Sequence, residues 1–241
     1  MKDTPAMATI GILGGMSAAS TALYYDRLNR EVRRRLGGLH SAEILLRSVD
    51  FAPIAQAQGT GNWDALAGRL SWEALRLERG GADLILLATN TMHKCADAIE
   101  AQLTVPFLHI AEATADALLA AGCSRPGLMA TRYTMEEAFY TGRLAARGLA
   151  PLLPEAADRA ETHRIIYDEL CRQEIRPKSR TAFEAIAARL VARGADSLIL
   201  GCTEVGLLLG PENTPVPVFD TTLIHCDRAL DHALAAAEEP A

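Results

Sequence analysis

Short apolar runs alternate along the chain with longer amphipathic stretches. Runs such as residues 83–87 and 197–200 consist almost wholly of aliphatic residues, which is typical of strands buried on both faces of a parallel sheet. The stretches between the runs carry apolar residues at helical spacing. The clearest of them spans residues 63–79 and stops at Gly80-Gly81, as helices commonly do. This alternation predicts an α/β fold with parallel sheets.

The same pattern gives the order of the expected elements. Strands are expected at residues 9–13, 43–49, 83–87, 105–110, 127–130, 197–200 and 216–219. Helices are expected at residues 18–36 with Ser17 as N-cap, and at 63–79, 112–121, 136–147, 159–172, 181–192 and 223–237, with one more between 87 and 105.

The chain also repeats itself. Residues 81–91 resemble residues 194–204, with four of the eleven positions identical and a shared Gly-Ala-Asp start. Weaker similarities in the same order relate residues 10–13 to 126–129 and residues 105–107 to 216–218. Buried strands resemble one another in any case, but the shared prefix favours duplication. We therefore expect two pseudo-symmetric Rossmann-like domains: residues 1–104 plus 215–241, and residues 105–214.

Thr89 and Cys202 occupy equivalent positions in the two repeats, each directly after its strand. Ligands of open α/β sheets bind beyond the carboxyl ends of the strands. Two domains related by a pseudo-twofold axis would bring these two residues to face each other across one cleft. That arrangement suits chemistry on the two faces of one carbon atom.

Cys202 is the candidate nucleophile or acid–base group. A thiol at a helix N-terminus has a lowered pKa, whereas the neighbouring Glu204 opposes thiolate formation as a like charge. Gly201 lets a ligand approach the backbone closely. The alternative is an inert buried cysteine, and the other four cysteines fit that alternative better.

Further polar groups follow the other strands and are candidates for binding a small-molecule substrate. Asn90 and Thr91 offer amide and hydroxyl donors to a carboxylate, although helix capping is an alternative role for such residues. Asp50 could contact a substrate amine or cap the next segment. The full candidate set for substrate binding is Met16, Ser17, Asp50, Asn90, Thr91, Thr131, Thr134, Thr203 and Glu204.

Composition narrows the class of protein. The net charge is −6 and no Lys/Arg-rich stripe appears, which argues against a nucleic-acid partner. No apolar run is long enough to span a membrane. The five cysteines show no metal-ligand spacing, so no metal site is expected, and a reducing cytoplasm fits them best.

Three motifs together resemble the cofactor-independent aspartate/glutamate/hydantoin racemases. The start at residues 10–17, the Thr89-Asn90-Thr91-Met92-His93 segment and the Gly201-Cys202-Thr203-Glu204 segment are similar to that family's opening loop and its two cysteine motifs. The resemblance implies two thiols on opposite sides of the substrate α-carbon and no pyridoxal phosphate or metal. It also implies that Thr91, Thr131 and Thr203 bind the substrate carboxylates. Because members of the family are often dimers, a homodimer is expected as well.

The chain departs from the family pattern at Thr89, where the first cysteine would stand. The Thr89/Cys202 pair resembles a subgroup that prefers L-aspartate and L-glutamate as substrates. A threonine hydroxyl is a much weaker acid than a thiol, so we expect slow turnover, with easier α-proton exchange on the L-isomer than net inversion. The alternatives are a single-cysteine decarboxylase or isomerase of the same fold, and a non-catalytic binder of acidic amino acids.

Overall fold

The aliphatic runs form strands that assemble into two separate sheets. The computed structural model describes residues 7–235, so the expected end of the last helix at residues 236–237 lies outside the described residues. The chain divides into unit 1, formed by Met1–His109 and His225–Ala241, and unit 2, formed by Ile110–Ile224. Strands and helices alternate in both units, and the α/β fold with parallel sheets is confirmed.

Unit 1 contains a four-stranded parallel sheet with the order β2-β1-β3-β4. The strands are β1 (Ile10–Gly14), β2 (Ile44–Ser48), β3 (Leu84–Leu87) and β4 (Phe107–Leu108). Every residue of β1 and β3 is buried, as the continuous apolar runs predict for central strands covered on both faces.

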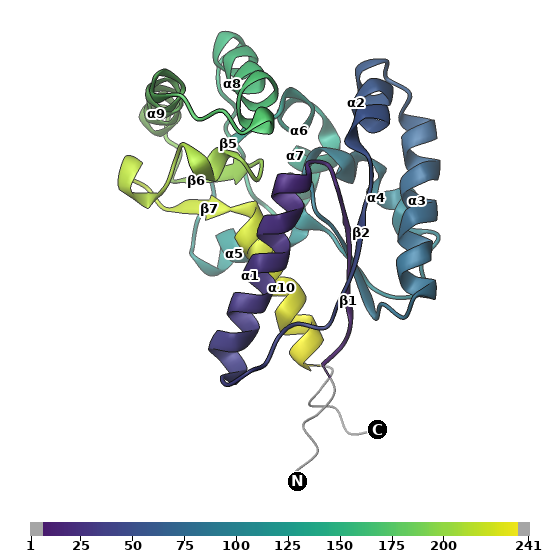
Figure 1. Cartoon of the computed structure of the whole chain (residues 1–241). Helices are drawn as coiled ribbons and strands as arrows, with labels where there is room; N and C mark the ends of the chain where they lie inside the picture. Colours follow the sequence, from purple (N-terminus) through teal and green to yellow (C-terminus); the bar gives the residue numbers. More distant parts are fainter. Residues whose placement is uncertain (1–6, 236–241) are drawn as a thin grey trace. The chain divides into compact units, whose positions relative to one another are not determined.

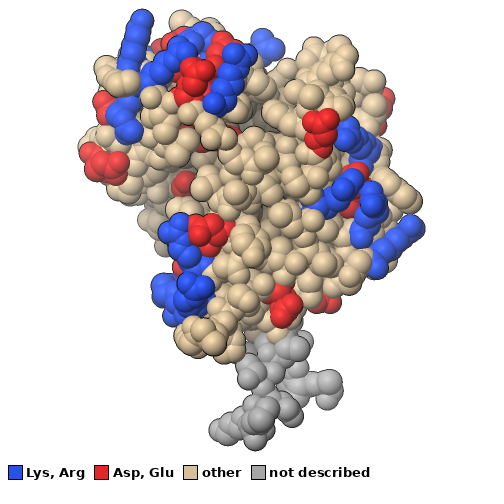
Figure 2. All heavy atoms as spheres, in the orientation of Figure 1, with Lys and Arg blue, Asp and Glu red and all other residues tan. Residues whose placement is uncertain are grey.

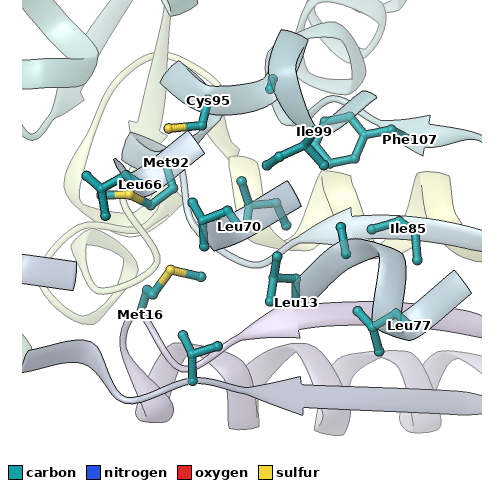
Figure 3. Packing of buried hydrophobic residues seen from close by; sticks show 14 of the residues in the cluster. Leu13, Met16, Leu66, Leu70, Leu77, Ile85, Met92, Cys95, Ile99 and Phe107 are labelled. Carbon is teal, nitrogen blue, oxygen red and sulfur yellow. The ribbon is translucent and has the colours of Figure 1, made fainter. Parts of the chain in front are cut away.

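Helices cover both faces of this sheet (Figure 1). On one face α1 (Ala18–Leu36) and the part of α10 (Thr221–Ala235) from residue 225 onward pack on Ile10, Ile12, Leu84 and Leu86. On the other face lie α2 (Phe51–Gly59), α3 (Trp63–Arg79), the 3-10 helix η1 (Thr91–Cys95) and α4 (Ala96–Glu100). Figure 3 shows this second layer, where Leu66 and Leu70 of α3 meet Met92 and Leu13.

Unit 2 repeats the architecture with three strands in the order β5-β6-β7. They are β5 (Pro126–Ala130), β6 (Ser197–Gly201) and β7 (Val218–Asp220). One face is covered by α5 (Ile110–Ala120), α6 (Arg132–Glu136) and α7 (Ala138–Ala146), the other by α8 (Ala156–Asp168), η2 (Leu170–Arg172), α9 (Pro177–Ala192) and η3 (Val205–Leu207), while η4 (Pro211–Asn213) lies before β7. A single bridge between Gly127 and Leu152 stands where unit 1 has β2.

The registers of the two sheets show how close the repeat is. Gly11 pairs with Ile85 in unit 1, and Gly127 pairs with Leu198 in unit 2. A Cβ at Gly11 would lie 2.5 Å from Ile85 Cδ1, and one at Gly127 would lie 2.8 Å from Leu198 Cδ2. Both glycines therefore make room for an aliphatic side chain at the equivalent position of the neighbouring strand, Ile85 or Leu198.

The shared Gly-Ala-Asp motif has the same structural task in both units. Asp83 Oδ2 accepts a hydrogen bond from the backbone N of Thr9 at 2.7 Å, and Asp196 Oδ2 accepts one from the backbone N of Arg125 at 2.8 Å. The glycine two residues before each aspartate has a positive φ, 98° in unit 1 and 94° in unit 2. The motif thus ends a helix and ties the start of one central strand to the next.

Some expectations need correction. Residues 215–224 belong to unit 2 rather than to the first domain, because β7 pairs with β6, and residues 105–109 belong to unit 1, because β4 pairs with β3. The helix expected at 136–147 is two helices broken at Glu137, whose backbone is extended. Helix α2, which Asp50 caps, was not foreseen because its apolar pattern is short.

The described surface carries mixed charges. Figure 2 shows blue and red side chains interspersed over the region of α8 and α9 on the face in view, rather than a stripe of one sign. Several of these residues form ion pairs, including Arg164 with Glu161 and Arg189 with Asp158. Among residues 7–235, no helix combines the length and apolarity that a membrane span requires.

Candidate active site

Polar side chains gather at the carboxyl edge of each sheet. In unit 1 the chain leaves β1 at Gly15 and β3 at Ala88, just before Thr89. In unit 2 it leaves β5 at Thr131 and β6 at Cys202. Because the strands within each sheet are parallel, the two departure points of one sheet lie at the same edge of that sheet. This is the edge where α/β proteins bind ligands.

Thr89 follows β3 and is half-buried, whereas the neighbouring Asn90 and Thr91 are buried. The backbone N of Thr89 donates to the carbonyl of Leu87 at 2.8 Å, so the chain turns sharply as it leaves the strand. The Thr89 carbonyl in turn accepts a hydrogen bond from His93 Nδ1 at 2.7 Å. The backbone of the candidate acid–base residue is therefore held on both sides.

The loop after β1 is packed tightly against β2. Gly15 has φ 96°, and a Cβ there would lie 2.2 Å from the carbonyl oxygen of Val49. Its backbone N donates to Thr21 Oγ1 at 2.7 Å. Ser17 caps α1 by accepting from the backbone N of Ser20, so this hydroxyl already has a structural role.

Met16 and Asp50 contribute less to a binding surface than the sequence suggests. The Met16 side chain joins the apolar cluster under the loop, as Figure 3 shows. Asp50 is exposed and accepts from the backbone N of Ala52 at 3.2 Å as the N-cap of α2. The structure thus gives Asp50 the capping contact that the sequence left open.

Cys202, Thr203 and Glu204 form a hydrogen-bonded group after β6. Cys202 Sγ donates to Glu204 Oε2 at 3.0 Å, and the Thr203 hydroxyl donates to the same oxygen. Cys202 is half-buried, while Thr203 and Glu204 are buried. One carboxylate oxygen therefore holds both the thiol and the hydroxyl in fixed directions.

The surroundings raise the pKa of the Cys202 thiol well above its ordinary value. Burial is the main cause, followed by the negative charge of Glu204 and the nearby Cys171 thiol. The expectation of a thiol activated by a helix N-terminus was wrong, because the segment that follows is only the three-residue 3-10 helix η3. Cys202 is consequently protonated at neutral pH in the absence of a substrate.

Two neighbouring features fix the position of the Cys202 segment. Gly201 lies against Ala130, so closely that a Cβ would come within 2.8 Å of the Ala130 Cβ. Arg180 of α9 donates to the carbonyls of Leu207 at 2.9 Å and Leu208 at 2.7 Å. These contacts anchor the chain on both sides of Cys202 and Glu204.

Thr131 and Thr134 are occupied with each other. Thr131 caps α6, and its Oγ1 lies 3.2 Å from Thr134 Oγ1. Thr134 has no exposed surface, whereas Thr131 is 4% exposed. Contact of the Thr134 hydroxyl with a substrate would require this helix start to move.

Three residues at these edges were missed from the sequence. Asp220 ends β7 and caps α10 by accepting from the backbone N of Thr222 at 2.8 Å. His109, which follows β4, packs its ring 4.5 Å from the ring of His93. Cys171 packs on the same apolar cluster as Cys202. Asp220 and His109 lie at the ends of equivalent strands, so the repeat could have indicated both positions. No pattern in the sequence indicated that Cys171 would lie near Cys202.

No group of three or more histidine, cysteine, aspartate or glutamate side chains within residues 7–235 is arranged to hold a metal ion. The described residues at the two carboxyl edges offer hydroxyl, amide, thiol and carboxylate groups. Such groups can hold a small polar molecule and transfer a proton.

Solved structures of other proteins resemble this fold over nearly its whole length. A crystal structure of a Yersinia pestis protein assigned to the Asp/Glu racemases matches with a TM-score of 0.89 and 48% identity, covering 95% of this chain and all of that one. An aspartate racemase homologue from Pyrococcus horikoshii OT3 matches with a TM-score of 0.83 and 30% identity, over 95% of this chain and all of that one.

Sequence comparison agrees. The broad specificity amino-acid racemase RacX of Bacillus subtilis (strain 168) is 24% identical over 216 residues, which cover 88% of this chain and 92% of RacX. The sequence profile of the Asp/Glu/hydantoin racemases matches residues 13–229. These matches support amino-acid racemase activity, and the chain belongs to the Asp/Glu/hydantoin racemase family.

Proposed function

We propose that the protein interconverts the L- and D-isomers of aspartate or glutamate by direct proton transfer at the α-carbon, with the L-isomer as the preferred substrate. The observation that carries this proposal is the hydrogen-bonded Cys202–Glu204 pair at the end of β6, equivalent in the repeat to Thr89 at the end of β3. The substrate class is supported by the Yersinia relative, which is assigned to the Asp/Glu racemases, and by the Pyrococcus relative, which is described as an aspartate racemase homologue.

The reaction begins with the removal of the α-proton from the L-isomer. The Cys202 thiol, whose Sγ donates to the Glu204 carboxylate at 3.0 Å, first loses its proton to water. The resulting thiolate takes the α-proton and leaves a carbanion stabilised by the substrate carboxylate. Because burial and Glu204 raise the pKa of Cys202, the thiolate is scarce but strongly basic.

The second half of the reaction returns a proton to the opposite face. The Thr89 O–H bond breaks and its proton goes to the α-carbon. Water then reprotonates the alkoxide, and the hydroxide that forms neutralises the proton that Cys202 released. An alkoxide is a costly species near neutral pH, so this step is slower than the first. The equilibrium constant of racemisation is one, so kcat/KM has the same value for the L- and the D-isomer. The preference for the L-isomer is therefore a difference between the two isomers in kcat and in KM, which cancels in their ratio.

Substituting the two neighbouring cysteines tests this proposal. L-aspartate and L-glutamate are incubated separately with the wild type, Cys202→Ser and Cys171→Ser, and the D-isomer is followed by chiral chromatography. We expect Cys202→Ser to lose at least about a thousandfold in rate, because serine is a much weaker acid and its alkoxide is rarely formed.

Cys171→Ser serves as the matched control, because Cys171 packs on the same apolar cluster. It should keep a rate within about threefold of the wild type, since the substitution preserves size and leaves the reacting thiol in place. Equal losses in both variants, or D-isomer formation that survives in Cys202→Ser, would overturn the proposal.

A further inference from the structure

We infer that His93 is a positioning residue for Thr89, and that it acts selectively on the proton-return step of the proposed racemisation, on which this inference rests. The His93 ring is 1% exposed and lies one helical turn after Thr89, in η1. Its ring nitrogen contacts the backbone carbonyl of Thr89, so its influence on the Thr89 hydroxyl passes through the Thr89 backbone.

The contact between the two residues has a defined direction. His93 Nδ1 lies 2.7 Å from the Thr89 carbonyl oxygen, and a carbonyl can only accept. The hydrogen therefore sits on Nδ1, and His93 donates. The bond fixes the peptide plane that follows Thr89, while the bond from Thr89 N to the Leu87 carbonyl fixes the plane before it. Together they set the Cα–Cβ direction of Thr89.

His93 is itself held by a stack of buried imidazoles. Its ring centroid lies 4.5 Å from that of His109 and 5.8 Å from that of His225, both edge to face. These are three of the six histidines in the chain, and all three are buried. The stack connects the end of β3 with the end of β4 and with α10.

The far end of the stack has a fixed tautomer. His225 Nε2 lies 2.8 Å from the carbonyl of Leu108, so this nitrogen carries a hydrogen and donates. Burial lowers the pKa of His225 to about 4, so its ring is neutral at pH 7 and its Nδ1 accepts from the Tyr24 hydroxyl at 3.0 Å. A neutral ring with both nitrogens engaged is a rigid support.

The repeat shows that this support is particular to unit 1. The residue equivalent to His93 in unit 2 is Gly206, which has no side chain. There Glu204 holds the reacting Cys202 thiol directly. Thr89 is the weaker acid of the pair, so its hydroxyl must be placed accurately to donate a proton, and a small misplacement is costly.

The experiment compares His93→Leu with His93→Asn. Leucine keeps apolar bulk but removes the donor, whereas the Asn side-chain nitrogen takes nearly the place of Nδ1 and can donate to the Thr89 carbonyl. Each variant is incubated with L-aspartate in D2O, and α-proton exchange and D-isomer formation are measured separately. Exchange on the L-isomer needs only Cys202, whereas D-isomer formation also needs Thr89.

We expect His93→Leu to lower D-isomer formation at least about tenfold while L-exchange stays within about threefold, and His93→Asn to recover most of the loss. Equal losses of exchange and inversion in His93→Leu would show a merely structural role and overturn the inference. So would unchanged inversion, or failure of His93→Asn to recover any activity while folded by circular dichroism.

Deuterium uptake at the backbone amides of residues 89–95 gives a readout that does not depend on activity. We expect faster uptake in His93→Leu and wild-type uptake in His93→Asn. If the wild type exchanges no α-proton, the proposed racemase function fails, and amide uptake alone then decides whether His93 orders the Thr89 segment. Equal uptake in the wild type and His93→Leu would overturn the inference in either case.

Discussion

At the scale of single residues, the two candidate acid–base groups differ in how they are supported. Cys202 is tied through its own Sγ–H to the Glu204 carboxylate, so its protonation depends directly on a neighbouring charge. Thr89 is tied through its backbone to His93, so its support is geometric. The thiol is tuned electrostatically, and the hydroxyl is placed by hydrogen bonds to its peptide groups.

The raised pKa of Cys202 predicts a pH dependence with a definite sign. The thiol must lose its proton to act as a base, and burial together with Glu204 keeps it protonated at neutral pH. The rate of α-proton exchange on the L-isomer should therefore rise with pH through the neutral and mildly alkaline range. In Glu204→Gln the negative charge is gone, so the midpoint of the rise should move to lower pH.

The pH profile of exchange is measured by proton NMR for the wild type and Glu204→Gln. Glu184→Gln is the control, because Glu184 is a carboxylate on α9 that accepts from Asn213 and is not among the charges that shift Cys202. Its profile should match the wild type. A midpoint that moves to higher pH in Glu204→Gln would contradict the electrostatic role of Glu204.

Thr89→Cys should speed up inversion. A thiol has a pKa of about 8.5, much nearer neutral pH than that of an alcohol, so it both donates and accepts a proton more easily. We expect D-isomer formation from L-aspartate to rise by about tenfold or more, measured by chiral chromatography. Thr91→Cys, one residue beyond Asn90, is the control and should bring no gain.

At the scale of elements, the structure shows why the chain turns tightly where each strand ends. The loop after β1 is held by Gly15, whose positive φ and contact with the Val49 backbone leave no room for a side chain. The loop after β6 is held by Gly201 against β5 and by Arg180 against the turn that follows. The backbone of both loops is therefore fixed by contacts with neighbouring strands and helices.

Gly15→Ala should destabilise unit 1, because a Cβ would lie 2.2 Å from the carbonyl oxygen of Val49 at φ 96°. We expect a loss of about 2 kcal/mol or more in the free energy of unfolding, measured in urea. Gly68→Ala is the matched control within α3, where no atom lies within 4 Å of the added Cβ. It should stabilise by about 0.5–1 kcal/mol; equal effects would contradict the packing of the Gly15 loop.

Most elements could be predicted from hydrophobic period and from helix-ending glycines. The bounds of α3 agree with the expected residues 63–79, and Ser17 is the N-cap of α1 as expected. The segment after Cys202 was expected to start a helix, but Val205–Leu207, which contains the poor helix former Gly206, forms only a 3-10 turn. The sign of the Cys202 pKa shift depended on that turn and on burial, which a local motif does not reveal.

At the scale of the whole molecule, duplication organises the chain. The strand registers, the Gly-Ala-Asp turns and the positions just past β3 and β6 correspond. The repeat was visible in the sequence because these turns need specific residues. The buried histidine stack was not visible, because His93, His109 and His225 are far apart in the chain and only folding brings their rings together.

The sequence repeat also could not predict the boundaries between the two units. Residues 215–224 were expected in the first domain, whereas hydrogen bonding of β7 to β6 places them in unit 2. An apolar run shows that a strand exists, but not which of two similar sheets it joins. Only the pairing partner, here Leu198 for Val218, decides the sheet.

We propose that Cys202 removes the α-proton from one face of the substrate and that Thr89 returns a proton to the other face. The most direct test follows L-aspartate in D2O with the wild-type protein, recording the isotope at the α-carbon of both isomers from the earliest turnovers. We predict that L-exchange outpaces inversion and that every D-isomer molecule carries deuterium from the outset, because its proton comes from the Thr89 side. D-aspartate that retains the original α-proton would contradict the claim, since one group would then carry the proton between the two faces.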